Sequence, residues 1–347
     1  MPQIDLSEYK KQLKSGALSG VIFLHGRDEY RKEAALSAAK KQISGPNALF
    51  NLVELDGSAP DLSALEAAVD TPPVFAEKKC ITLPGLNPEK LKSDELNTLL
   101  TILEDFPSES HLLLISCPDE HFQPKKSAKC RKLLAACEKS GLSVEISLPS
   151  AREISLLLAG TAKAYGSSID PELCRMLAEL CGSDMQAVMR EGEKLLALAA
   201  GRAVTREDIA GLVTPAVEAD AFSLSAAILR KDLKEANRLL DALFYRREEP
   251  VMILGALSSA FVDIYRVKIA QGSKHPPREL AALYSCYKGR EFRLDKAARL
   301  SSGTDLRSLR LSLDLLAQAD LALKSSRQDP QTLLTVLFCE LAELRSR

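Results

Sequence analysis

A glycine at the end of an apolar segment is the first place in this chain where residue types and spacing could do chemistry. Residues 21–30 read Val-Ile-Phe-Leu-His-Gly-Arg-Asp-Glu-Tyr, so an apolar run stops at Gly26 and a charged helical segment follows. A strand, a tight turn and a helix start, in this order, form the geometry with which α/β nucleotide-binding domains hold phosphate groups. The turn is therefore a candidate ATP site.

The residues after Gly26 do not fit that chemistry. A phosphate loop reads Gly-x-x-x-x-Gly-Lys-Ser/Thr, because glycine amides wrap the phosphates, the lysine reaches the outer ones and the hydroxyl holds magnesium. Here Arg27, Asp28 and Glu29 follow, with no second glycine and no Gly-Lys-Ser/Thr, and two carboxylates face any anion. The pattern predicts a degenerate nucleotide site at Gly26, Arg27 and Asp28 that does not bind ATP.

A second candidate site is the proline-rich turn, residues 71–75, which reads Thr-Pro-Pro-Val-Phe. Proline fixes φ and removes an N–H donor, so two prolines in succession favour a rigid turn. We expect this turn to present Val74 and Phe75 outward, where they could bind a partner. The alternative is that both side chains belong to the core at the entrance of the next strand.

The cysteines and histidines do not show the spacing of metal ligands. Cys130 and Cys137, and likewise Cys174 and Cys181, are seven residues apart, whereas zinc sites generally need Cys-x-x-Cys pairs held in turns. Eight cysteines in a reducing compartment are better interpreted as small buried side chains. We expect no metal and no other cofactor.

Composition limits the class of protein. A chain of 347 residues is expected to fold as two or three domains. Its 46 basic and 47 acidic residues give a net charge of -1, which does not indicate nucleic-acid binding. A balanced total charge does not exclude a local basic patch. The N-terminus has no apolar signal core, and no run approaches the roughly 18 apolar residues of a membrane span. We expect a cytoplasmic protein that has no membrane partner.

Hydrophobic patterning predicts an α/β domain followed by helices only. Five short apolar strands alternate with helices, which predicts a five-stranded parallel sheet covered on both faces. After Pro149 the strand signals stop. We predict three domains, an α/β domain over residues 1–149, a small helical domain over residues 150–213 and a larger helical bundle over residues 214–347. Expected helix caps are Asp28, Asp170, Ser183 and Thr205, with a helix stop at Gly45 and Pro46.

The order of several short motifs resembles that of the delta subunit of bacterial DNA polymerase III. The first strand and its Gly-Arg-Asp-Glu-Tyr turn resemble the opening strand of that family, and residues 71–79 resemble its aliphatic-Phe turn. Residues 182–186 and 191–195, Gly-Ser-Asp-Met-Gln and Glu-Gly-Glu-Lys-Leu, resemble its lid domain. Residues 320–324, Asp-Leu-Ala-Leu-Lys, followed by Asp329-Pro, resemble its collar domain. The match runs from end to end.

The resemblance implies a fold and a role. Delta subunits have an AAA+-like α/β domain, a helical lid and a helical collar. They bind no ATP, grip the ring-shaped sliding clamp and help to open it for loading onto primed DNA. The implied clamp-binding residues are Pro73, Val74 and Phe75. The implied partners are the sliding clamp (beta), the gamma/tau-type motor and delta-prime-type subunits of the loader, and primer-template DNA. The protein would be no enzyme by itself but a part of the DNA polymerase III holoenzyme.

Two further predictions concern DNA and the rival function. In the collar loop the family can place an aromatic residue near template DNA, where this chain has Arg327, so we expect at most phosphate contacts from Lys324 and Arg327. Basic residues between 125 and 132 are either a solvated helix face or DNA contacts.

The alternative function is an active AAA+ ATPase of a related loader or remodeller. The missing phosphate loop, and the absence of an acidic pair after the strand at residues 79–83, disfavour that alternative.

Overall fold

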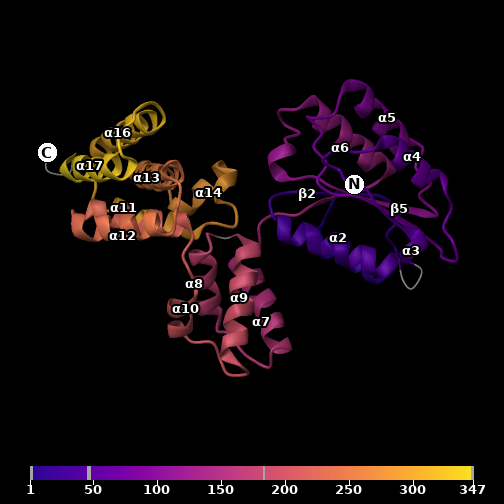
Figure 1. The fold of residues 1–347 in the computed structure, drawn as a ribbon, viewed down its shortest axis with the longest axis horizontal. Coiled ribbons are helices and arrows are strands. Elements are labelled where there is room, and N and C mark those ends of the chain that lie inside the picture. The colour runs from indigo at the N-terminus through magenta and orange to yellow at the C-terminus, as the bar shows by residue number, and fades with distance from the viewer. Residues whose placement is uncertain (1–2, 45–47, 183, 345–347) are drawn as a thin grey trace. The chain divides into compact units, whose positions relative to one another are not determined.

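The structure, a computed structural model, describes residues 3–44, 48–182 and 184–344. The helix stop predicted at Gly45 and Pro46 and the cap predicted at Ser183 lie outside these residues. Contacts within the chain separate two compact units, Met1–Leu148 and Pro149–Arg347. The first unit holds the sheet and the second is helical (Figure 1).

Within the described residues, the first unit is built on one sheet of six parallel strands in the order β1-β6-β2-β5-β4-β3. The prediction of five strands is wrong, because the sheet contains one more, the edge strand β1. Its residues Gln-Ile-Asp form no apolar run, and they become a strand by pairing with β6, where Gln3 lies opposite Ser143 and Asp5 opposite Glu145. The strands are β1 (Gln3–Asp5), β2 (Gly20–His25), β3 (Leu52–Glu54), β4 (Lys79–Leu83), β5 (His111–Ser116) and β6 (Gly141–Glu145).

Helices cover both faces of the sheet, as predicted (Figure 1). Successive side chains of a strand point to opposite faces, so Val21 and Phe23 of β2 pack on the face covered by α4, α5 and α6. Ile22 and Leu24 pack on the other face, against α1 and α2. The helices of this unit are α1 (Leu6–Lys14), α2 (Glu29–Ser44), α3 (Ala48–Asn51), α4 (Leu62–Asp70), α5 (Ser93–Glu104) and α6 (Ala128–Ser140), with a 3₁₀ turn, η2 (Asp119–His121).

Short polar side chains begin the helices that matter for the candidate sites. The Asp28 carboxylate accepts a hydrogen bond from the Arg31 amide at 3.0 Å, which confirms Asp28 as the cap of α2. The four-residue helix α3 was not predicted, because it is too short to show a period.

The second unit begins with four helices, α7 (Ala151–Ala164), α8 (Pro171–Leu180), α9 (Met185–Ala199) and α10 (Arg206–Leu212). Asp170 and Thr205 cap α8 and α10 as predicted, because their side chains accept hydrogen bonds from the Glu172 and Asp208 amides. The cap of α9 is Asp184, whose carboxylate accepts from the Gln186 amide at 3.0 Å.

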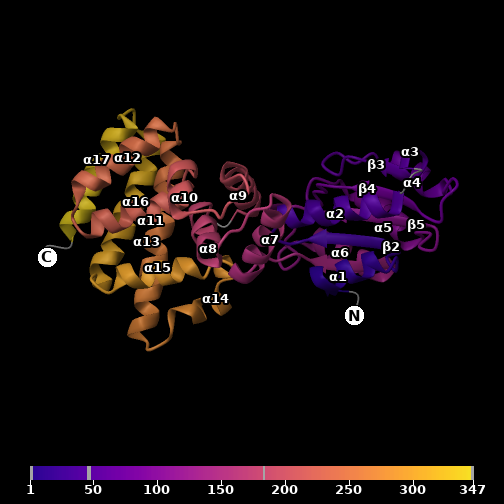
Figure 2. The same cartoon turned by 90° about the horizontal axis from the view of Figure 1, so that it is seen from below.

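The remaining helices form a bundle around α13 (Figure 2). α13 contacts α11, α15 and α16 and buries Leu257, Phe261 and Ile264 in the core. A buried polar network also ties it to its neighbours, since the Asp263 carboxylate accepts from Tyr287 Oη at 2.7 Å and from Arg293 Nε at 2.8 Å. The elements are α11 (Val217–Leu229), α12 (Leu233–Tyr245), α13 (Pro250–Gly272), η3 (Pro277–Glu279), α14 (Leu280–Leu283), η4 (Ser285–Tyr287), α15 (Phe292–Ser301), α16 (Leu306–Ser325) and α17 (Pro330–Glu343).

The length of α13 corrects one expectation. In the part of the chain that the structure describes, it is the one continuous helix long and apolar enough to cross a membrane, with a mean hydropathy of 1.4 over its best 18 residues. The expectation that no segment approaches a membrane span is therefore wrong, because α13 has the length and the apolar composition of one. The core helix of a bundle passes the same test, and α13 lies in that position.

Candidate functional site

The proline-rich turn joins α4 to β4 and presents two apolar side chains to solvent. Phe75 is 92% exposed and Val74 is 37% exposed, whereas Pro73 is half-buried. The alternative that both side chains belong to the core is therefore wrong for Phe75. An aromatic side chain left almost fully exposed, in a unit whose large apolar side chains are mostly buried, is a candidate anchor for a partner.

A buried asparagine holds the main chain of this turn. The Asn51 side chain is completely buried, and its Nδ2 donates to the Val74 carbonyl at 2.7 Å. The Val74 amide donates to Asn51 Oδ1, also at 2.7 Å. Both main-chain polar groups of Val74 are thus satisfied by one rigid side chain, which keeps the residue in one conformation.

The first residue of the turn is held by two other buried groups. Lys79 Nζ donates to the carbonyls of Ala68 and Thr71 at 2.7 and 3.0 Å, at the C-terminal end of α4. His111 Nε2 lies 3.0 Å from the same Thr71 carbonyl, which can only accept, so this nitrogen carries the proton. Burial lowers the pKa of Lys79, and the negative end of the helix dipole offsets part of that effect.

The turn stores some backbone strain at its tip. Phe75 has a φ of 52°, in the left-handed region that residues with a Cβ rarely adopt. The three groups that hold the turn come from α3, β4 and β5. Sequence reasoning missed Asn51 and His111, because nothing local marks a polar residue whose partner is 23 or 40 residues away. It also missed Lys79, which is near the turn in sequence but is buried only by the folded sheet.

At the degenerate nucleotide site, the chain after β6 closes over the turn. Gly26 has a φ of 112°, and a Cβ at this position would lie 2.4 Å from the Ile146 carbonyl oxygen. The Ile146 amide donates to the His25 carbonyl at 2.7 Å, and the Asp28 amide donates to the Ile146 carbonyl at 3.3 Å. The main chain of Ile146 thus packs directly against Gly26, which leaves no room for a side chain at this position.

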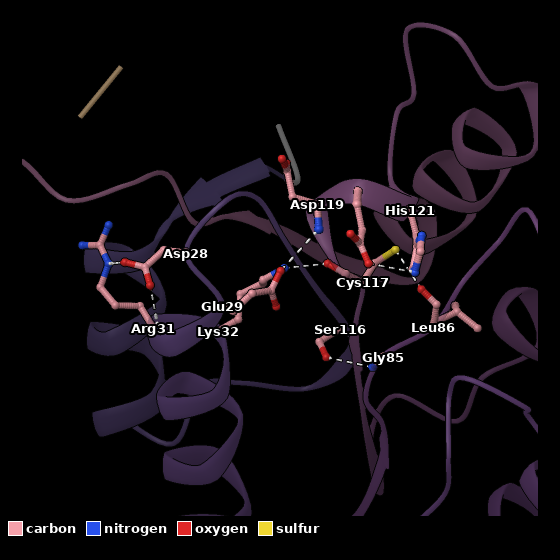
Figure 3. Close-up of polar contacts among 11 residues, drawn as sticks. Asp28, Glu29, Arg31, Lys32, Gly85, Leu86, Ser116, Cys117, Asp119 and His121 are labelled. Carbon is pink, nitrogen blue, oxygen red and sulfur yellow. Dashed lines mark hydrogen bonds and ion pairs between the residues drawn. The ribbon is translucent and has the colours of Figure 1, made fainter. Parts of the chain in front are cut away.

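Charged residues at the start of α2 are paired with one another (Figure 3). Asp28 is buried and accepts from Arg31 Nε at 2.6 Å. The Lys32 ammonium is also buried and donates to Glu29 Oε1 and to the Cys117 carbonyl, each at 2.7 Å. The Lys32 ammonium is thus directed at the main chain that follows β5.

His25, at the end of β2, is a buried histidine. Among the described residues its Nε2 has no hydrogen-bond partner, and its ring packs against Phe23 and Phe122 with centroids 5.4 and 5.0 Å away. Burial, and secondarily the charge of Lys32, lower the pKa of His25 to about 4. The imidazole is therefore neutral at pH 7.

In the residues that the structure describes, no group of three or more His, Cys, Asp and Glu side chains is arranged to hold a metal ion. Six of the eight cysteines are buried, whereas Cys286 is exposed and Cys339 is intermediate. Burial raises the pKa of Cys80 and of Cys117 to about 12, so these thiols remain protonated and unreactive at neutral pH.

The predicted DNA-contacting residues lie at the end of α16 and in the loop after it. Lys324 Nζ pairs with Asp320 at 2.6 Å on the exposed surface of α16, and Arg327 is exposed in the loop. Asp329 ends the loop as the cap of α17, accepting from the Thr332 amide at 2.8 Å. The loop itself offers the Arg327 cation, with the ion-paired Lys324 in the last turn of α16, and the loop sequence contains no aromatic residue for stacking.

Comparisons with known proteins cover the whole chain. Residues 218–341 match the family model of the C-terminal domain of the DNA polymerase III delta subunit. The DNA polymerase III subunit delta of Bacillus subtilis (strain 168) is 25% identical over 342 residues, which cover 95% of each chain. The structure of the DNA clamp loader delta protein of Bacillus subtilis matches with a TM-score of 0.62 and 21% identity, covering 97% of this chain and 99% of that one.

The structural match confirms the fold class, a parallel α/β unit followed by helices only. The family model supports the C-terminal part of the assignment and the curated relative supports its full length. The resemblance to the delta subunit of bacterial DNA polymerase III, which the sequence motifs indicate, is thus confirmed from end to end.

Proposed function

We propose that this protein is a clamp-loader subunit that binds the sliding clamp through the proline-rich turn and helps to open it for loading onto primed DNA. The observation that carries the proposal is the exposure of Phe75 and Val74 on a turn whose main chain is held by buried polar groups. Ordering a flexible loop on binding costs affinity, so a turn that is already held in shape is suited to insert an apolar anchor into a pocket.

In this role the subunit supplies binding energy and no ATP hydrolysis. Asp28 and Glu29 are ion-paired within the chain, and the main chain of Ile146 packs directly against Gly26. Strand β4 runs into Pro84 and Gly85, with no acidic pair to hold magnesium or to orient a water molecule. The energy for changing the clamp would come from a neighbouring motor subunit.

The helical part would connect the subunit to the rest of the loader in the cytoplasm. We propose a division of the second unit into a lid, which ends near residue 213, and a collar, residues 214–347, that contacts motor and delta-prime-type subunits. Lys324 and Arg327 would contact phosphates of primer-template DNA, because phosphate contacts need positive charge and no recognition of the bases.

The test is a double variant, Val74→Ala with Phe75→Ala, measured for clamp affinity and for melting temperature. Truncating a hot-spot residue typically costs about 2 kcal/mol or more, so we expect binding to the purified clamp of the same organism to weaken about a hundredfold to a thousandfold. The melting temperature should change little, because Phe75 contributes almost no core contact.

A matched control is Leu198→Ala with Tyr245→Ala, which removes apolar side chains that are 52% and 91% exposed in the second unit. The control should bind the clamp normally. Unchanged affinity of the Val74 and Phe75 variant, with an unchanged melting temperature, would mean that the clamp is bound elsewhere.

A further inference from the structure

Phe50 is a third exposed apolar side chain in the first unit. Among the residues of this unit whose burial the structure describes, the exposed large hydrophobic side chains are Phe75, Val74 and Phe50, and Phe50 is 64% exposed. Phe50 belongs to α3 and stands well before the proline-rich turn in sequence. Two of these three side chains belong to the proline-rich turn, so the position of Phe50 relative to that turn matters for the proposed interface.

Asn51 places Phe50 beside the turn. Neighbouring Cα atoms are about 3.8 Å apart, and the Asn51 side chain hydrogen-bonds both main-chain polar groups of Val74 at 2.7 Å. The Cα of Phe50 is therefore within about 10 Å of the Val74 main chain. The two segments that carry the exposed apolar residues are joined by the same buried side chain.

The chemistry of both segments fits one kind of partner surface. Neither Ala48–Asn51 nor residues 71–75 contain a charged residue, so they offer no cations for phosphates and no ion pairs for an acidic surface. Each phenylalanine can bury about 150 to 250 Å², and binding hot spots cluster around such aromatic anchors. The complementary surface is an apolar pocket.

We propose that Phe50 is a third anchor for the sliding clamp, and that the clamp pocket which takes Val74 and Phe75 extends over α3. The inference rests on the proposed function, and it adds a second segment of the chain to the proposed interface. Asn51 is a positioning residue in this arrangement, because it sets the place of Phe50 relative to the turn without needing to touch the clamp.

The test compares Phe50→Ala, the Val74→Ala/Phe75→Ala variant and the control Tyr245→Ala for binding to the purified clamp. We expect Phe50→Ala to weaken binding about tenfold, which corresponds to about 1.4 kcal/mol, with little change in melting temperature. Tyr245→Ala, whose aromatic side chain is also exposed, should leave the affinity unchanged. In the unmodified protein, clamp binding should slow hydrogen exchange in the peptide that contains Phe50.

The outcomes separate this inference from the proposed function. If Phe50→Ala binds normally while Val74→Ala/Phe75→Ala binds weakly, the clamp is bound through the turn alone and the role of Phe50 is refuted. If neither variant weakens binding, the proposed clamp site itself is wrong. Should Phe50→Ala lower the melting temperature, the exchange measurement decides, and an unprotected Phe50 peptide would overturn the inference.

Discussion

The side-chain amide of Asn51 forms two 2.7 Å hydrogen bonds with the main chain of Val74, directly before Phe75, whose φ is 52°. A non-glycine residue in this left-handed region costs on the order of 1 kcal/mol or more. Two internal hydrogen bonds contribute about 0.5 to 1.5 kcal/mol each, so they can offset that strain. The exposed aromatic side chain is thereby held in a conformation that the free chain would rarely adopt.

Replacing Asn51 by Ala should loosen the turn and weaken clamp binding without removing an anchor. Both hydrogen bonds to Val74 are lost and its polar groups remain without those partners, so we expect a loss of about 2 kcal/mol in the free energy of unfolding. The specific readout is faster hydrogen exchange at the Val74 amide together with a lower clamp affinity. Thr71→Val is the control, since the Thr71 hydroxyl bonds to Ala67 within the helix and does not hold Val74. Unchanged exchange at Val74 would show that other contacts hold the turn.

The isolated protein should neither bind nor hydrolyse ATP. Asp28 and Glu29 follow Gly26 where a phosphate loop would continue, their carboxylates are ion-paired within the chain, and Lys32 is directed at the Cys117 carbonyl. Equilibrium dialysis with labelled ATP and magnesium should give no retention, while an ATPase with an intact phosphate loop, measured in parallel, retains the nucleotide. Stoichiometric binding at micromolar ATP would instead favour the alternative function, an active AAA+ ATPase.

Stability should fall as the pH is lowered from about 6.5 to about 4, in part because of His25. Its pKa is about 4 in the folded protein and about 6.5 in an unfolded chain. Between these values the unfolded state binds a proton that the folded state does not, which favours unfolding by up to roughly 3 kcal/mol.

The variant His25→Phe isolates this contribution, because a phenyl ring can keep the packing against Phe23 and Phe122 and does not titrate. Urea unfolding at pH 7 and near pH 4.5 should show a smaller loss of stability for this variant than for the unmodified protein. His275→Phe, which changes an exposed histidine, should keep the normal pH dependence. Equal losses in all three proteins would mean that His25 does not titrate in this way.

The segment 214–347 should fold as a helical domain when expressed alone. It contains a core of its own, in which α13 packs against α11, α15 and α16, and the network of Asp263, Tyr287 and Arg293 lies within it. We expect strong helical circular dichroism and one cooperative unfolding transition. A disordered fragment, together with a folded fragment of residues 149–347, would place both helical parts in one cooperative domain.

Local sequence signals predicted the strands that are apolar runs and the helices that begin with a polar cap. The apolar runs of β2, β4 and β5 predicted the buried centre of the sheet, and Asp28, Asp170 and Thr205 marked helix starts, because a cap acts on amides only two or three residues away. The edge strand β1 and the short helix α3 were missed, since neither has a period of its own and β1 depends on its pairing with β6.

The sequence by itself determined that a phosphate loop is missing and that a rigid proline-rich turn precedes a buried strand, because both properties follow from residue types and backbone limits within a few positions. Only the tertiary structure decided that Phe75 is exposed, that Asn51 holds Val74, and that Phe50 is tied to the same place. These relationships join α3 to a turn 23 residues away, and they are fixed by two hydrogen bonds that satisfy the buried Asn51 amide, which no local pattern encodes.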